Sequence, residues 1–522
     1  SMLKLHDFCN RARRRIIAAR AGYKAGTGKG ASEVQWTAWQ KMDEEERKGL
    51  RFHEQQNDLV RSFVQPDGGK LPDIGLLMID EGHLLEENFA RIFATGISIA
   101  SMMRSLKALR EAYPKKILAQ ELADIAEAWD ILRQVGAANG GDTLMSQHNA
   151  AATEAVTKVR LALKSIVARK FGESAPVRRL LGGLIETSRA LNLAASSNGS
   201  RPGMTTRISW SPSVQWPSIE VGRYDISREM DFLWTLMVND RAVLVSATLY
   251  DDFSHNRIEG TRRTLSIRQG SIRTLPPVRP HWTIEPVTAF LPRPVSITET
   301  NRAEVAFYRP SSKFATGEAF DQWATRWREQ IAEYIAQVYQ SAEGGTLVLM
   351  TSHQDRAAVV ALLEQRIPVE ALIDHRPEIG VEGVKRLYLR ATAGGLKPLL
   401  VAVGGAWTGL DLSSDALSSM TGVATAPDRD TVLTDLVIPN APIGANRTLT
   451  HQYRREFNGA ADISSTAILL RQGIGRLVRR EGLPRRSRRL HFLDARLHDP
   501  RWNAFFLPIK RILSVYQSVR EI

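Results

Sequence analysis

The chain has 522 residues, of which 43% are hydrophobic and 24% charged, a size and composition typical of a globular protein with roughly two to four domains. It has no apolar run of about 18 residues that could span a membrane, no signal-peptide pattern, and one cysteine, Cys9, which excludes an internal disulfide or a four-cysteine cluster; we expect a cytoplasmic protein. The net charge of +14 favours a polyanionic partner, with nucleic acid first, over a merely basic surface.

Residues 24–32 (KAGTGKGAS) contain a Gly-Lys pair like that of a phosphate-binding loop. Such a loop needs a glycine five residues before the pair and a Ser or Thr directly after the lysine. Tyr23 and Gly30 occupy those places, and a basic helix at 11–20 precedes the run instead of an apolar strand. We therefore interpret the run as a flexible basic loop.

Residues 76–87 (LLMIDEGHLLEE) form a short apolar run that ends in two carboxylates, Asp80 and Glu81. The run has the length of a buried parallel strand, and ligands of open α/β sheets bind at the carboxyl ends of such strands. In a nucleotide hydrolase the first carboxylate holds magnesium and the second orients or deprotonates the attacking water. The alternative is a strand that ends at a solvated, acidic helix start.

Residues 98–196 show apolar positions at three- and four-residue spacing, which predicts helices, with a break at 136–142 that suggests an antiparallel helical pair. The segment looks inserted into a sheet. Its basic residues could face a phosphate backbone or could form an ordinary solvated helix surface. They are Lys158, Arg160, Lys164, Arg169, Lys170, Arg178 and Arg179.

Residues 208–221 alternate like a strand, and residues 242–249 (AVLVSATL) form a second apolar strand, where we expect the interrupted sheet to resume. Ser246 and Thr248 lie at its tip. They could couple the carboxylate site to a bound polymer, or Ser246 could simply cap a buried strand.

The carboxyl half repeats a strand, a polar tip and a helix, which predicts a second α/β domain with a parallel sheet. A helix is expected at 320–340, and the strand at 344–352 ends in Thr351 and Ser352. A buried strand at 399–403 runs into GGAWTGLDLS at 404–413, and another strand follows at 435–439.

Residues 463–480 (ISSTAILLRQGIGRLVRR) place Gln472, Arg476 and Arg479 at four- and three-residue spacing. On a helix this spacing predicts that the three side chains share one face. Clustered arginines suit the charge that develops on a transferred phosphoryl group. A solvated basic helix and turn is the alternative.

In chain order these motifs resemble motifs II to VI of superfamily two helicases, in the variant of the XPD and DinG group. The resemblance covers residues 72–97 and about 205–500, and the tail HFLDARL at 491–497 is similar to the last strand of that family. The matching motifs are DEGH at Asp80, SATL at Ser246, LVLMTS at Leu347, GGAWTGLDL at Gly404 and QGIGRLVRR at Gln472.

The resemblance implies an α/β fold with two RecA-like domains and a helical arch, and the activity of an ATP-dependent helicase that moves 5′ to 3′ on DNA. It implies a partial first RecA-like domain with a vestigial iron–sulfur region at 1–71, the first domain at 72–97 and 205–265, the arch at 98–204, and the second domain at 266–522.

The resemblance also implies site residues, cofactors and partners. ATP and Mg²⁺ would lie between the two domains, with Asp80 on the metal and Glu81 on the water, and single-stranded DNA would cross both domains of a monomer that opens DNA duplexes. From the second domain Gln472, Arg476 and Arg479 would reach the phosphates, and Gly409 and Asp411 would sense the nucleotide. The DNA contacts would be Ser246, Thr248, Thr351, Ser352 and stacking near Trp407.

Two departures from the family pattern qualify this interpretation. With Cys9 alone the chain cannot hold the family's iron–sulfur cluster, which favours the DinG-like branch associated with type IV CRISPR systems and a CRISPR ribonucleoprotein complex as partner. Motif I is missing, so either a segment that carries it precedes this sequence or the ATPase is inactive. We expect the former, because motifs II, V and VI keep their chemical types. The alternatives are an inactive nucleic-acid-binding or docking remnant, and an RNA-directed helicase.

Overall fold

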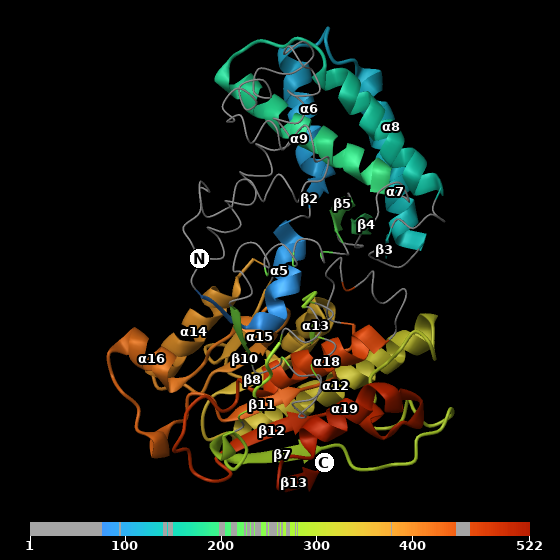
Figure 1. Cartoon of the computed structure of the whole chain (residues 1–522). Coiled ribbons are helices and arrows are strands. Elements are labelled where there is room, and N and C mark those ends of the chain that lie inside the picture. Colours follow the sequence, from blue (N-terminus) through green and yellow to red (C-terminus); the bar gives the residue numbers. More distant parts are fainter. Residues whose placement is uncertain are drawn as a thin grey trace. The chain divides into compact units, whose positions relative to one another are not determined.

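The computed structural model in Figure 1 forms two compact units, and we describe each by itself. Unit 1 comprises residues 1–250, 256–274 and 448–457, and unit 2 comprises residues 251–255, 275–447 and 458–522. The basic helix and loop predicted before residue 76 lie outside the described residues. These are 76–92, 95–138, 143–144, 150–197, 204–209, 217–223, 226, 230, 234, 242–246, 249, 258, 261–262, 265–267, 272–276, 278, 280–376, 378–444, 451 and 460–522.

A seven-stranded sheet forms the centre of unit 2, in the order β13-β7-β12-β11-β8-β10-β9. Every neighbouring pair is parallel. This confirms the α/β class predicted from the alternation of strands, polar tips and helices. The strands are β7 (Val287–Leu291), β8 (Thr346–Leu349), β9 (Leu372–Asp374), β10 (Leu399–Ala402), β11 (Asp435–Ile438), β12 (Arg488–Phe492) and β13 (Ser518–Glu521).

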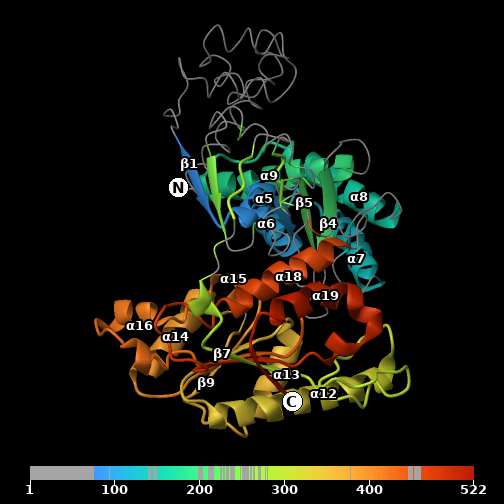
Figure 2. The same cartoon turned by 60° about the horizontal axis from the view of Figure 1, so that its bottom comes forward.

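Helices cover both faces of this sheet, so apolar residues of its strands are buried on both sides. Alternate residues point to opposite faces: Leu347 and Leu349 of β8 join one buried cluster, and Val348 joins the other. The first cluster includes residues of α14 (Val381–Ala393), α18 (Ala460–Ile474) and α19 (Asn503–Leu513). The second includes residues of α12 (Gly317–Ser341) and α13 (His353–Leu363). Figure 2 shows α18 and α19 on one side of the strands and α12 and α13 on the other.

Short helices in the loops between these elements make up the rest of the helical structure described in unit 2. The α-helical ones are α15 (Ala406–Gly409) and α16 (Ser414–Thr421). The 3₁₀ turns are η3 (His281–Thr283), η4 (Pro427–Arg429), η5 (Ala495–His498) and η6 (Pro500–Trp502).

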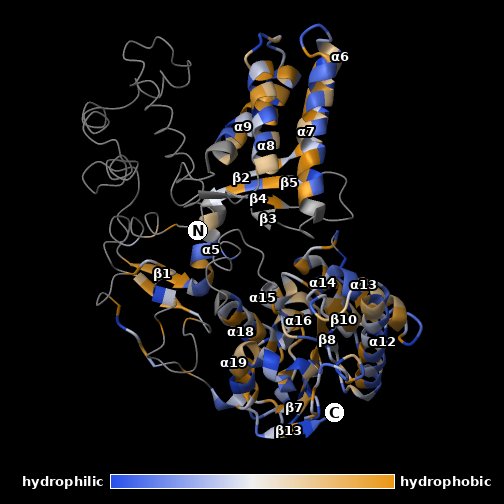
Figure 3. Ribbon diagram, turned by 90° about the vertical axis from the view of Figure 1, so that its right-hand side faces the viewer, coloured by the Kyte–Doolittle hydropathy of each residue, from blue (hydrophilic) through white to orange (hydrophobic). Residues whose placement is uncertain are grey.

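In unit 1 the predicted helical segment folds as four helices against a four-stranded antiparallel sheet. The helices are α6 (Ile99–Ala112), α7 (Ala119–Ala138), α8 (Ala150–Val167) and α9 (Ala175–Ser197). The sheet order is β2 (Thr95–Ser98), β5 (Ser218–Arg223), β4 (Met204–Ser209) and β3 (Thr143–Leu144). Each helix carries both hydrophobic and hydrophilic positions in Figure 3, and the apolar ones share one core with the strands.

Trp129 of α7 ties this helical core to the sheet. Its side chain is fully buried, and its Nε1 donates a hydrogen bond of 3.0 Å to the carbonyl of Pro217, directly before β5. Strands β4 and β5 therefore share a core with the helices, although the sequence suggested a domain boundary at residue 204, between the helices and these strands. The domain limits given by the sequence stay predictions.

A second, two-stranded parallel sheet of unit 1 joins β1 (Leu77–Asp80) to β6 (Ala242–Val245), with Asp80 opposite Val245. The sheet thus resumes after the insertion, as the sequence predicted. A 3₁₀ turn, η1 (Gly82–Leu84), and α5 (Leu85–Ile92) follow β1. Ile79 and Leu85 are buried with Met230 in the core beneath this pair of strands.

Candidate functional site

The two candidate carboxylates of unit 1 lie at the carboxyl end of β1, where the chain turns sharply. Glu81 has φ 52° and ψ 46°, the left-handed conformation that few residues other than glycine adopt. Its backbone N–H donates a hydrogen bond of 2.9 Å to Asp80 Oδ1. Backbone conformations of this kind cost energy and are concentrated at functional sites. The turn fits the interpretation of Asp80 and Glu81 as a chemical pair.

The glycine that follows them lets the turn pass close to the neighbouring strand. A Cβ atom at Gly82 would lie 3.2 Å from Leu244 Cδ2, tighter than most contacts of a Cβ atom. A larger residue would push the turn away from β6. Close packing against Leu244 therefore explains why the DEGH motif has a glycine at position 82.

Ser246, directly after β6, connects the two strand ends by hydrogen bonds. Its Oγ donates to Glu81 Oε2 over 2.9 Å and lies 2.7 Å from His83 Nδ1. Because a serine hydroxyl has one hydrogen and the carboxylate can only accept it, the Nδ1 of His83 carries the hydrogen of the second bond. The same Nδ1 is 3.3 Å from Glu81 Oε2. Three motif residues from two strands thus form one cluster.

The cluster holds one oxygen of Glu81 and leaves the other accessible. The His83 side chain is buried, with 7% of its surface exposed, whereas 55% of the Glu81 side chain is exposed. Among the described residues no hydrogen bond engages Glu81 Oε1. This oxygen could therefore accept a hydrogen from a water molecule. Thr248, the other predicted residue at this strand tip, lies outside the described residues.

In unit 2 the loop after β10 carries the predicted residues Gly409 and Asp411. Gly404 begins it with φ +59°, a backbone conformation that favours glycine. One turn of helix, α15, ends at Gly409, and Asp411 Oδ1 then accepts a hydrogen bond of 3.2 Å from the N–H of Ser413. Asp411 therefore shapes the loop that leads into α16.

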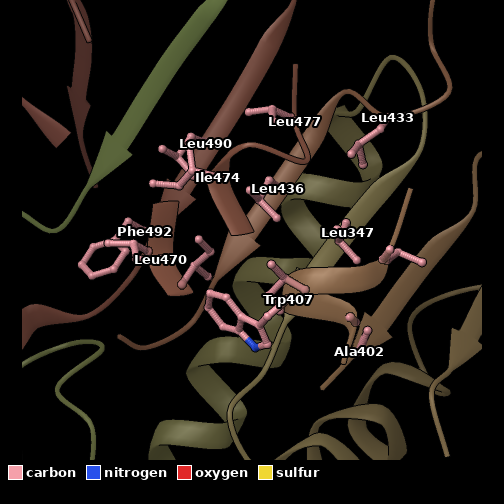
Figure 4. Packing of buried hydrophobic residues seen from close by; sticks show 14 of the residues in the cluster. Leu347, Ala402, Trp407, Leu433, Leu436, Leu470, Ile474, Leu477, Leu490 and Phe492 are labelled. Atoms are coloured by element: carbon pink, nitrogen blue, oxygen red, sulfur yellow. The ribbon is translucent and has the colours of Figure 1, made fainter. Parts of the chain in front are cut away.

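Trp407 of the same loop is a core residue, and the prediction that it stacks nucleic acid is wrong for this structure. Only 1% of its surface is exposed, and its Nε1 donates to the carbonyl of Met350 over 2.9 Å. A Cβ atom at Gly473 of α18 would lie 2.7 Å from the indole ring. Figure 4 shows the ring among apolar side chains, and its burial leaves no face for a base.

The prediction that Gln472, Arg476 and Arg479 share one helix face is also wrong. Helix α18 ends at Ile474, so it includes Gln472 but neither arginine. The N–H of Arg476 bonds the carbonyl of Gly473 over 3.1 Å, so the hydrogen bonds tighten to the three-residue spacing of a 3₁₀ turn. Gly475 lies in this turn, and glycine is a poor residue for continuing an α-helix.

Arg476 connects this turn to the loop after β10. Its Nη1 donates to the carbonyl of Leu410 over 2.7 Å, its Nε to that of Trp407 over 3.4 Å, and its Nη2 to that of Thr408. Arg479 is exposed, and its side chain has no hydrogen bond or ion pair within the part of the chain that the structure describes. Both arginines line one pocket of unit 2 together with Ser413, Ser414 and Arg480. The two arginines are thus close together but differently engaged.

The predicted polar tip of β8 is bonded within unit 2. Ser352 caps α13, because its Oγ accepts a hydrogen bond of 3.1 Å from the N–H of Asp355. Thr351 Oγ1 accepts from Arg309 Nη1 over 2.8 Å and from Asn440 Nδ2 over 2.9 Å. Sequence reasoning missed both partners. Asn440 gave a signal, since it lies two residues after a buried strand as Thr351 does, but nothing near Arg309 in the sequence marks it.

The described residues do not form a metal site built from protein ligands alone. They contain no group of three or more His, Cys, Asp or Glu side chains that could hold an ion. Mg²⁺ in nucleotide sites needs only one or two protein carboxylates, since water and phosphate complete its shell, so the exposed Asp80 fits this ion. No helix in the same part of the chain is long and apolar enough to cross a membrane.

Comparison with known proteins gives a similarity of fold. No protein-family model and no curated protein matches the sequence. A solved structure titled XPD helicase matches with a TM-score of 0.49 and 13% identity, over 88% of this chain and 71% of the other. A structure titled XPD apo matches with a TM-score of 0.48 and 13% identity, over 88% and 80%. The structure of S. tokodaii Xpd4 matches with a TM-score of 0.47 and 15% identity, over 90% and 80%. The mixed α/β class of the chain rests on the helices and strands described above.

Proposed function

We propose that the protein is an ATP-dependent DNA helicase of the XPD and DinG type, which moves 5′ to 3′ on single-stranded DNA. The observation that carries the proposal is the hydrogen-bonded cluster of Glu81, Ser246 and His83. It joins the residues that resemble motifs II and III, which are 165 positions apart in the chain. In a motor the residue that activates water must respond to the track, and a direct bond between the two motifs is a physical route for that response.

In unit 1 the proposed chemistry begins at the end of β1. Asp80 would hold Mg²⁺, and the bound metal and triphosphate supply the electrophilic phosphorus and neutralise the charge that develops on it. Glu81 Oε1 would orient the attacking water and accept its hydrogen. Ser246 and His83 fix the other oxygen, so the carboxylate loses little freedom when it acts.

In unit 2 the predicted nucleotide-site residues have different proposed roles. Arg479 would reach the phosphates, since it is exposed and its side chain has no partner among the described residues. Arg476 would hold the loop at 407–410, and Gly409 and Asp411 in and after that loop would sense the nucleotide. Gln472, in the last turn of α18, would contact the nucleotide as the resemblance implies.

The proposed track is single-stranded DNA, contacted by the polar strand tips. Thr351 and Ser352 are partly exposed in unit 2, and Thr248 is the corresponding candidate in unit 1. The resemblance also implies Ser246 as a contact, but its hydroxyl is bonded to Glu81, so we assign Ser246 to the carboxylate site instead. The net charge of +14 favours a phosphate backbone as the ligand. We also propose, on the sequence resemblance, that the helicase is accessory to a type IV CRISPR interference complex.

A second function is an ATPase-inactive module that only binds nucleic acid. The observation in its favour is the run at 24–32, which lacks the residues of a phosphate-binding loop. This function and the motor require the same DNA contacts and differ in nucleotide turnover.

Strand displacement on duplexes with a 5′ or a 3′ tail tests the proposal, together with ATP hydrolysis measured with and without single-stranded DNA. A motor of this type unwinds the 5′-tailed DNA and hydrolyses ATP faster when DNA is present. Glu81→Gln should abolish hydrolysis and leave DNA binding intact, because the amide keeps the shape but accepts no proton. A Glu81→Gln variant that hydrolyses ATP at the wild-type rate would contradict the assignment, and DNA binding without any hydrolysis by the wild type would favour the inactive module.

A further inference from the structure

Three neighbouring strands of the unit 2 sheet place a polar side chain at the same position beyond their carboxyl ends. Thr351, Asn440 and Asp494 each lie two residues after the last residue of β8, β11 and β12. These strands are adjacent in the order β12-β11-β8 and parallel, so the three residues lie along one edge of the sheet. In open α/β sheets this edge is where ligands bind.

Hydrogen bonds link these residues into a continuous chain along the edge. The N–H of Ala441 donates to Asp494 Oδ2 over 2.8 Å, and Asn440 Nδ2 donates both to the carbonyl of Ala441 over 3.0 Å and to Thr351 Oγ1 over 2.9 Å. The bond to the carbonyl fixes the orientation of the amide, because a flipped Asn440 would set two acceptor oxygens against each other. Asn440 is therefore a donor toward Thr351.

Thr351 receives a second donor from Arg309, whose Nη1 lies 2.8 Å from its Oγ1. A hydroxyl oxygen has two lone pairs and one hydrogen. Both lone pairs of Thr351 are occupied by groups that can only donate, so its hydrogen must point to some other acceptor. Within the described part of the chain that hydrogen has no acceptor. The hydroxyl is thus restricted to donating.

The charge around this hydroxyl is positive and well fixed. Arg309 Nη2 donates to Asp355 Oδ2 over 3.0 Å, while Arg328 donates twice to Oδ1 of the same carboxylate, over 2.9 and 2.7 Å. Two guanidinium groups therefore share one carboxylate, which leaves an uncompensated positive charge beside Thr351. Burial lowers the pKa of Arg309, with Asp355 acting in the opposite direction, so the charged form of this side chain is poorly solvated. An anion placed there would stabilise it.

We propose that Arg309 and Asn440 are positioning residues that hold the Thr351 hydroxyl as a hydrogen-bond donor to a phosphate oxygen of a bound single strand. The inference rests on the proposed DNA-binding function and specifies that Thr351 is the donor of the hydrogen bond to DNA. A hydroxyl that can only donate, next to positive charge, selects an anionic acceptor over a donor group, and a backbone phosphate offers that acceptor at every nucleotide. The contact is therefore independent of base sequence.

The test is the affinity of the whole protein for a fluorescently labelled oligo-dT strand, measured by anisotropy. Thr351→Val removes the hydroxyl at nearly constant shape and should weaken binding about tenfold, the effect expected for a lost hydrogen bond to a charged group. Thr351→Ser keeps the hydroxyl and should restore affinity close to wild type. Asn440→Leu removes the donor without adding a charge and frees one lone pair of Thr351, so that its hydroxyl is no longer restricted to donating; it should weaken binding part of the way toward Thr351→Val. In the Thr351→Val background the Asn440→Leu change should have little further effect.

Thr421→Val is the matched control, since the hydroxyl of Thr421 donates to the carbonyl of Leu417 within α16 and should be dispensable for binding. Thermal unfolding of all variants confirms that they are folded. If Thr351→Val binds like the wild type, or if Asn440→Leu weakens binding equally with and without the Thr351 hydroxyl, the inference is overturned and the proposed function stands. If millimolar ATP displaces the strand from wild type but not from Thr351→Val, the acceptor is a nucleotide phosphate and the inference is likewise overturned. A wild-type protein that does not bind oligo-dT overturns both.

Discussion

Replacement of Ser246 by alanine separates two roles that this residue could have in the proposed motor. The sequence resemblance suggests a contact with DNA, whereas in the structure the Ser246 hydroxyl donates to Glu81 Oε2 and receives a hydrogen bond from His83. Removal of the hydroxyl leaves His83 as the remaining partner of that carboxylate oxygen, 3.3 Å away. We therefore expect Ser246→Ala to impair ATP hydrolysis and to leave DNA affinity unchanged.

The size of the effect follows from the exposure of the partners. A hydrogen bond to a charged group contributes roughly 1.5–3 kcal/mol when it is shielded from solvent. Because 55% of the Glu81 side chain is exposed, screening by water reduces this to about 1 kcal/mol. If the bond positions Glu81 in the transition state, the maximal rate of DNA-stimulated ATP hydrolysis should fall about fivefold. Steady-state hydrolysis at saturating ATP measures this rate, and anisotropy measures the DNA affinity.

Ser98→Ala is the control, because it removes another serine hydroxyl of unit 1, the N-cap of α6, which accepts a hydrogen bond of 3.4 Å from the N–H of Ser101. It should lower stability slightly and leave both measurements unchanged. Hydrolysis by Ser246→Ala at the wild-type rate would refute the proposed positioning of Glu81. A loss of DNA affinity together with hydrolysis would show that Ser246 acts as a contact to the strand, and would refute the reasoning from the hydrogen bonds.

The other predictions concern unit 2. Arg476→Gln should lower the melting temperature and expose the loop at 407–410 to protease, because its guanidinium bonds three carbonyls there, whereas Arg479→Gln should leave the melting temperature unchanged and reduce ATP hydrolysis. Trp407→Ala should destabilise the fold by about 3–5 kcal/mol in denaturant titrations, in contrast to the selective loss of DNA binding expected for a stacking residue. Burial lowers the pKa of His491, although its bond to Asp435 acts in the opposite direction, so the unfolded chain binds the extra proton more readily. The contribution of neutral His491 to the free energy of unfolding is therefore fully present above the ordinary histidine pKa of about 6.5 and is lost as the pH falls below it. Denaturant titrations at about pH 7 and about pH 5.5 should show a smaller decrease in the free energy of unfolding for His491→Gln than for the wild type.

The parts of the fold that could be predicted from the sequence are those where local pattern and tertiary environment agree. Leu347, Val348 and Leu349 of β8 are consecutive apolar residues because helices cover both faces of the strand, so the strand and its polar tip at Thr351 can be predicted from the sequence. The pairing of β1 with β6 also followed, because each is an apolar strand with a polar tip. The association of β4 and β5 with the helices of unit 1 could not be predicted, since strand alternation does not specify which sheet a strand joins.

The errors at the candidate site have one physical origin: sequence spacing gives neighbours along the chain but not the path of the backbone in space. Arg476 and Arg479 keep helical spacing from Gln472, yet the helix ends at Ile474 and both arginines follow a tighter turn. That turn lets Arg476 bind the carbonyls after Trp407, and the loop that holds these carbonyls buries the indole against α18. The end of one helix therefore affects two residues at once: it brings Arg476 to the carbonyls of the loop after β10 and leaves Arg479 exposed, which is why we propose Arg479 for the phosphate contact.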